Sequence, residues 1–82
     1  MKIKLGTQLI LEPTFTDKTE KYQCKVVDLD DQFIYIDYPM DTLSNRTVFL
    51  MDGMQLRATF VEESKAVYAF QTEVLGKKSK QT

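Results

Sequence analysis

The sequence predicts a small all-β domain, and two features of the chain indicate it. Apolar residues recur at every second position through most of the 82 residues, which is the period of a half-buried strand, and no long stretch repeats at the helical period. Polar turns separate these stretches into six short strands, at the spacing of a small barrel or sandwich. A barrel is favoured, because six short strands in a flat sheet would leave two open edges.

The first half of the chain contains three expected strands. Residues 8–15 alternate, and Pro13 places this strand at a sheet edge or a bend. The alternation of the second strand slips at Val26-Val27, which predicts a β-bulge that would keep its apolar side chains pointing inward. After a tight turn at residues 30–32, residues 33–37 are apolar on both faces, so we expect a central strand covered on both sides.

The second half contains a loop and three more expected strands. Pro39 ends the third strand, and the polar residues that follow predict a loop rather than a helix as far as Arg46. Residues 47–50 are expected to form a short strand, closed by a turn at Asp52-Gly53. The remaining strands are expected at residues 54–61 and 66–75, the latter being the longest.

Composition excludes several classes of function. Eleven basic residues face twelve acidic ones, and this net charge of −1 counts against a dedicated nucleic-acid binder. Histidine is absent, which removes the usual general base and the commonest metal ligand. The single cysteine, Cys24, has no histidine to activate it and is expected in the core. Neither a signal-peptide core nor an apolar run of membrane-spanning length occurs, which predicts a cytoplasmic protein.

No motif for catalysis, cofactor binding or metal binding stands out. The aspartates at positions 28, 30 and 31 lack the glycine and the spacing of a calcium loop, and aspartate is common in tight turns. The three glycines are too scattered for a phosphate-binding loop. The aromatic residues could stack single-stranded bases, but without a basic excess we expect them to fill the core. We therefore expect no enzyme, with no catalytic, cofactor-binding or metal-binding residues.

Four segments together carry a family resemblance: KYQCKVVDL at residues 21–29, FIYIDYP at 33–39, VFLMDG at 48–53 and VYAFQTEVLG at 67–76. In this order and spacing they resemble the N-terminal domain of YcgR-like flagellar brake proteins, in the Gram-positive branch. The resemblance implies a six-stranded antiparallel split β-barrel, a PilZ-associated N-terminal domain, over residues 1–76. It also implies that residues 77–82 begin a linker to a C-terminal PilZ domain that this chain does not contain.

The resemblance also implies a ligand for the parent protein. In that family the PilZ domain and the linker bind cyclic di-GMP, through an R-x-x-x-R motif and a [DN]-x-S-x-x-G motif, and the bound receptor slows motility. Arg46 and Arg57 are the only arginines and lack the four-residue offset, and Ser44 and Gly53 do not match the second motif. Cyclic di-GMP is therefore expected only with the PilZ domain and linker, and we expect no cofactor in this chain.

The function that this resemblance implies is that of a non-catalytic regulatory or interaction domain in a cyclic di-GMP-responsive protein controlling flagellar motility. Its expected partners are the C-terminal PilZ domain and components of the flagellar motor or other motility machinery. Two alternatives stay open. One is a nucleic-acid-binding OB-like or SH3-like barrel, which the charge balance disfavours. The other is a flavin-binding split barrel, which rests on analogy of fold alone.

A surface for the next domain is expected near the end of the last strand. The argument concerns apolar residues that the alternation does not place inward: Ile36, Met40, Leu43, Met51, Met54 and Leu75. An ordinary interface buries roughly 800 Å² on each partner, so the isolated domain should expose part of this set. The opposing interpretation is that several of these residues complete the core, as methionine often does. The candidate domain-interface residues are Tyr38, Pro39, Met51, Met54 and Leu75.

Overall fold

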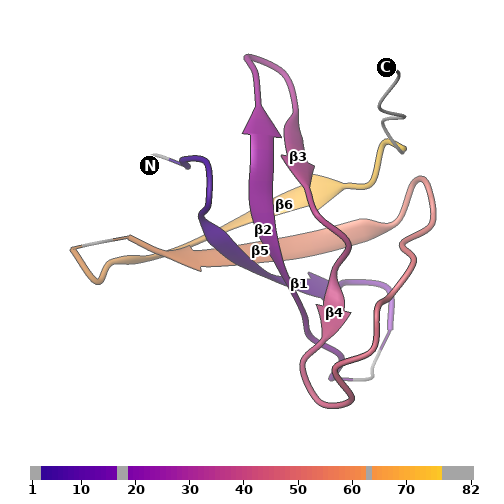
Figure 1. The fold of residues 1–82 in the computed structure, drawn as a ribbon. Helices are drawn as coiled ribbons and strands as arrows, with labels where there is room; N and C mark the ends of the chain where they lie inside the picture. The colour runs from indigo at the N-terminus through magenta and orange to yellow at the C-terminus, as the bar shows by residue number, and fades with distance from the viewer. Residues whose placement is uncertain (1–2, 17–18, 63, 77–82) are drawn as a thin grey trace.

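The computed structural model describes residues 3–16, 19–62 and 64–76, and within these ranges it contains strands and no helix (Figure 1). This confirms the all-β prediction. The six strands are β1 (Gln8–Pro13), β2 (Tyr22–Leu29), β3 (Ile34–Ile36), β4 (Met40–Asp41), β5 (Gln55–Val61) and β6 (Val67–Glu73). Nothing in the described part of the chain is a helix that could cross a membrane.

All strand pairs are antiparallel, in the order β3-β2-β1-β5-β6, with β4 pairing to β2 beside this path. The β2–β3 pair crosses the β5–β6 pair at a steep angle, and the short β1 connects them, so the sheet curls strongly (Figure 1). The fold is therefore the expected small antiparallel split barrel. Among the described residues β3 and β6 do not pair with each other, so they are the two edges of the curled sheet.

The core lies on the concave face of this sheet, and strict alternation places it there. Alternate residues of the three central strands are buried: Leu9, Leu11 and Pro13 on β1, Tyr22, Cys24 and Val26 in the first part of β2, and Leu56, Ala58 and Phe60 on β5. Partly buried side chains from β6 and from the loops pack against them. Burying these apolar surfaces is the main favourable term for so small a fold.

Two of the core residues carry a titratable group in an apolar environment. Cys24 is a free buried thiol, as the sequence predicted, and its pKa is raised to about 12 by burial and by the nearby charge of Asp37. Tyr22 donates its hydroxyl to Glu20 Oε2 at 2.6 Å. Burial, followed by this hydrogen bond, raises the pKa of Tyr22 to about 12. Both groups are therefore neutral in the folded protein near neutral pH.

The β-bulge lies where the broken alternation predicted it. Val26 pairs with Ile36 and Asp28 pairs with Tyr35, so Val27 is the extra residue of β2. However, Val27 in the bulge and Leu29 beyond it are exposed and do not turn inward as expected. The reason is the length of β2: β1 pairs with it only as far as Lys25, so the β2–β3 hairpin extends past the core.

The prediction of a central strand over residues 33–37 was wrong. The strand is Ile34–Ile36, which lies at one end of the sheet order and is only half-buried. β1 is central although it contains Pro13, so of the two placements predicted for this strand, an edge or a bend, the structure has the bend. Pro13 is the last residue of β1, where a bend begins. Proline has no N–H to donate, and the N–H of the next residue, Thr14, donates to Gln55 O at 3.1 Å.

Two other strand predictions differ from the structure. Residues 47–50 make only an isolated bridge, between Thr47 and Met40, so they form a loop, and the sixth strand is the two-residue β4. The segment up to Arg46 is not helical, as predicted, because Asp41 Oδ1 accepts the N–H groups of Leu43 and Ser44 and holds a turn. β6 is shorter than expected and β2 is the longest strand. The predicted linker, residues 77–82, lies outside the described residues.

Candidate functional site

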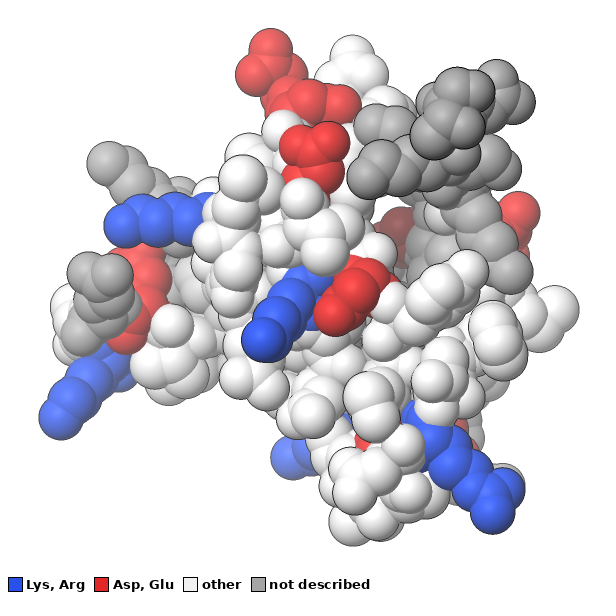
Figure 2. Space-filling view, viewed as in Figure 1, with Lys and Arg blue, Asp and Glu red and all other residues white. Residues whose placement is uncertain are grey.

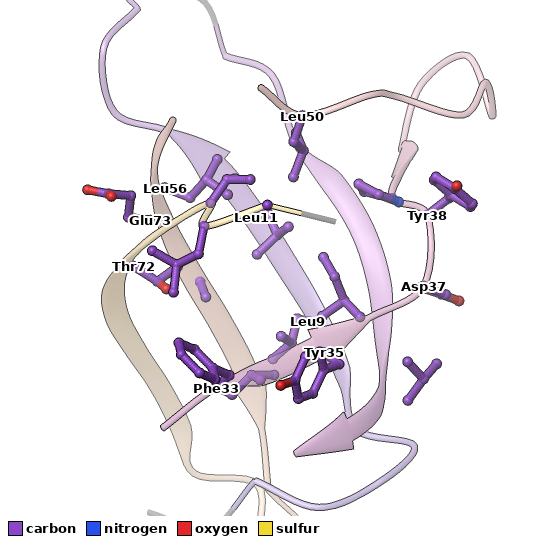
Figure 3. A pocket seen from close by; sticks show the side chains of 18 of the residues that line it. Leu9, Leu11, Phe33, Tyr35, Asp37, Tyr38, Leu50, Leu56, Thr72 and Glu73 are labelled. Atoms are coloured by element: carbon purple, nitrogen blue, oxygen red, sulfur yellow. The ribbon is translucent and has the colours of Figure 1, made fainter. Parts of the chain in front are cut away.

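An apolar groove of about 990 Å³ lies on the concave side of the curled sheet (Figure 3). Its floor consists of the core residues Leu9, Leu11, Leu56 and Ala58. Three segments form its walls. They are residues 32–39 with β3, residues 48–50, and residues 72–76 at the end of β6. The groove therefore occupies the gap between the two sheet edges.

The first wall is fixed by the turn that joins β2 to β3. Asp30 Oδ1 accepts the N–H groups of Gln32 and Phe33, each at 2.8 Å, and Asp30 Oδ2 accepts the hydroxyl of Tyr35 at 3.2 Å. Aspartate is favoured at such positions because its carboxylate can replace backbone acceptors in a tight turn. The result is an edge-to-face pair of Phe33 and Tyr35, with ring centroids 6.3 Å apart, on one side of the groove.

A second aromatic pair lies where two loops meet. Tyr38 and Phe49 are edge-to-face, with centroids 5.9 Å apart, and the N–H of Val48 donates to Pro39 O at 2.8 Å to hold the loops together. Both rings are largely in solvent, with Tyr38 63% and Phe49 67% exposed. An exposed aromatic cluster beside an apolar groove does little for the fold and is typical of an interaction surface.

The third wall is the end of β6, which is tied to the turn before β5. Phe70, Thr72 and Val74 face the groove and are half-buried. The N–H of Gly53 donates to Val74 O at 2.6 Å, and the N–H of Val74 donates to Met54 O at 2.9 Å. Gly53 has φ of 86°, a conformation that glycine adopts without steric cost.

The charged residues in the lining of the groove are all acidic: Asp28, Asp37 and Glu73. Further acidic side chains gather over the β2–β3 turn, at the top of the view in Figure 2. Within the described residues no three histidine, cysteine or acidic side chains are grouped so that they could hold a metal ion. The groove is thus suited to apolar contact with a partner that brings positive charge to its rim.

The structure separates the five candidate interface residues. Tyr38, Pro39 and Leu75 line the groove, whereas Met51 and Met54 do not. Tyr38, Met51 and Leu75 are exposed, the last two at 73% and 65%. Pro39 is buried and Met54 is half-buried against the core. Of the other residues outside the alternation, Leu43 is exposed, and Ile36 and Met40 are half-buried. Their role as a domain interface stays a prediction.

Sequence reasoning missed Phe33 and Phe49, because it assigned the aromatic residues to the core. Both are exposed in the structure, whereas Phe60 is in the core as expected. A usable signal existed for Phe49: its neighbours Val48 and Leu50 are half-buried, and alternation through this segment places Phe49 on the opposite side. No comparable signal distinguishes Phe33, which follows directly after a turn.

Known proteins resemble the chain along nearly its whole length. A family model described as "Flagellar protein YcgR" matches residues 4–82. The uncharacterized protein YpfA of Bacillus subtilis (strain 168) is 29% identical over 75 residues, covering 92% of this chain and 35% of YpfA. The solved structure of the Bacillus subtilis inhibitor of motility, MotI/DgrA, superposes with a TM-score of 0.82 at 30% identity, covering 94% of this chain and 37% of that one.

This chain spans about a third of the length of these two relatives. The solved structure and this one agree in fold over nearly all of the shorter chain. The family match covers the segments of sequence that suggested it, and it includes the floor and all three walls of the groove. The chain therefore belongs to the family of the flagellar protein YcgR.

Proposed function

We propose that this chain is a non-catalytic regulatory and interaction domain of a cyclic di-GMP-responsive protein that controls flagellar motility. The observation that carries the proposal is the match of nearly the whole chain to the flagellar YcgR family, together with its fold similarity to an inhibitor of motility. The groove adds physical support, because it offers apolar contact surface and its described lining holds no histidine or cysteine.

The groove and its rim are the surface that this function needs. A regulatory domain must have two packings against a neighbour, and the ligand must favour one of them. Tyr38, Phe49 and Leu75 are exposed apolar side chains on the walls, and a neighbouring PilZ domain that covered them would remove apolar surface from water. Cyclic di-GMP would then act through the neighbour and the linker, and this domain would transmit the change.

A domain exchange tests the proposal. This chain would replace the matching third of the Bacillus subtilis motility inhibitor, and swimming would be measured at low and high cyclic di-GMP. We expect the exchanged protein to inhibit swimming at high cyclic di-GMP. We expect Tyr38→Ser combined with Phe49→Ser to weaken that inhibition. Val61→Ser is the matched control, because Val61 is also exposed but does not line the groove.

Two results would refute this function. One is an exchanged protein that is folded and expressed but leaves swimming unaffected at every level of cyclic di-GMP. The other is full inhibition by the groove variant, which would show that the groove has no part in regulation. Protein levels measured by immunoblot separate these results from a loss of expression.

A further inference from the structure

The outer edge of β6 is the longest open strand edge in the described part of the molecule. β6 pairs with β5 along all seven of its residues. The N–H of Val74 donates to Met54 O, and the N–H of Glu62 donates to Ala66 O. These two bonds show which residues of the ladder form the hydrogen-bonded pairs. In an antiparallel ladder such pairs alternate, so the backbone groups of Tyr68, Phe70 and Thr72 point to β5.

The intervening residues therefore direct their N–H and C=O groups to the open side: Val67, Ala69, Gln71 and Glu73. No described strand pairs with that side. Natural edge strands are usually protected by a lysine, a proline, a bulge or short length. β6 has no lysine, proline or bulge, and its only charge is Glu73 at its last position, since its sequence is VYAFQTE and its register with β5 is continuous. Such an edge is a template for another strand.

We propose that β6 pairs antiparallel with β6 of a second copy of this chain, about a two-fold axis at Phe70. In this register Ala69 lies opposite Gln71 of the other copy, and Val67 lies opposite Glu73. It is the one two-fold register in which all four outward residues find partners within the strand itself. Each of the four opposed pairs exchanges two hydrogen bonds, giving about eight in a closed isologous interface.

The side chains suit this register. The only charged residue of β6 is Glu73, and the two copies of it lie at opposite ends of the paired strands, each across from an apolar valine. On the concave face Phe70 meets its own counterpart, beside the existing contact of Phe60 with Phe70. Ala69 is small enough to face Gln71 without a clash.

The size of the contact sets the expected strength. An interface made by one seven-residue strand edge is smaller than the roughly 1,600 Å² of a standard complex. We therefore expect a reversible dimer that forms at high micromolar concentration and dissociates on dilution. The two concave grooves would then lie side by side on one continuous sheet.

Analytical ultracentrifugation of the 82-residue chain tests the association. We expect the weight-average mass to rise toward that of a dimer between about 10 µM and 1 mM. Gln71→Pro should abolish this rise, because the N–H of Gln71 points outward and its removal costs no bond to β5. Gln71→Ala is the matched control and should still dimerise. A circular dichroism melt confirms that both variants fold.

Disulfide trapping tests the register. Ala69→Cys and Gln71→Cys would be oxidised separately and as an equimolar mixture, and native Cys24 is buried and does not interfere. We expect several-fold more covalent dimer in the mixture, because only residues 69 and 71 of different copies come within disulfide distance. The proposal is overturned by a chain that stays monomeric at 1 mM, by dimerisation of folded Gln71→Pro, or by equal trapping of either variant alone.

Discussion

Replacing Phe60 with alanine is the sharpest test of the core. Phe60 is 2% exposed, and its ring stacks on Tyr68 at 5.5 Å and meets Phe70 edge-on at 6.3 Å. A buried phenylalanine removes about 200 Å² from water, which at about 25 cal/mol per Å² is worth about 5 kcal/mol. An alanine at this position still buries part of that surface. We therefore expect Phe60→Ala to lower the free energy of unfolding by about 3–4 kcal/mol, within the range measured for such substitutions.

This loss is large relative to the stability of the domain. At about 0.05–0.15 kcal/mol per residue, the 82 residues give a free energy of unfolding of about 4–12 kcal/mol. With an m-value of about 1 kcal/mol per molar urea, the unfolding midpoint of Phe60→Ala should fall by about 3 M. Circular dichroism is the appropriate probe, since the chain has no tryptophan.

Phe49→Ala is the matched control for that experiment. Phe49 is also a phenylalanine but is 67% exposed, so we expect its midpoint to change by less than about 0.5 M. The conservative Phe60→Leu should fall between the two variants and guards against a Phe60→Ala protein that does not fold at all. Equal midpoints for Phe60→Ala and Phe49→Ala would refute the placement of the core described here.

Three other predictions follow from the same structure. Isothermal titration of this chain with micromolar cyclic di-GMP should show no heat of binding, because neither family motif is present, and a clear micromolar isotherm would contradict this. The pKa values of Cys24 and Tyr22 are raised to about 12, from 9.0 and 10.0. The unfolded chain therefore releases these protons first and stability should fall as the pH rises from about 9 to 12. Thermal melts across that range check the slope, which Cys24→Ala should reduce. Finally, Asp30→Ala removes the acceptor for two backbone N–H groups and should lower the free energy of unfolding in urea by about 1–2 kcal/mol. Asp31→Ala, beside it in the turn, is the control and should change this free energy little.

The sequence predicted most accurately the strands that bury one face and expose the other. β5 was expected at residues 54–61 and occurs at Gln55–Val61. Strict alternation of apolar and polar residues fits a strand with one buried face and fixes which side chains point inward. Residues 33–37 were wrongly assigned to a central strand. Their two apolar faces fit a central strand that is covered on both sides, but they fit equally well an edge strand that borders a groove. Residues 47–50 have strand composition, but a ladder needs a partner strand, which local sequence does not specify.

The candidate site was predictable only in part, for a related reason. Leu75 was identified because it lies outside the inward alternation, and Tyr38 was named with it as a candidate interface residue. Both line the groove. Phe49 was missed because composition cannot distinguish an aromatic residue that fills a core from one that borders an open groove. The groove itself results from the curl of the sheet and the gap between β3 and β6, which are non-local properties.

The extension of the β2–β3 hairpin past the core has a consequence for dynamics. Val26 is still held by backbone hydrogen bonds to Gly6 and Thr7, but beyond it β2 pairs only with β3. This end of the hairpin can therefore open while the β1–β5 and β5–β6 ladders stay intact. Elements with few neighbours open at a lower free energy than the whole domain, and their amide hydrogens exchange sooner. One wall of the groove is therefore its least stable part. A partner that binds only the closed hairpin would stabilise it and would slow amide hydrogen exchange in Ile34–Ile36. Binding in the groove and folding of the hairpin would then be coupled.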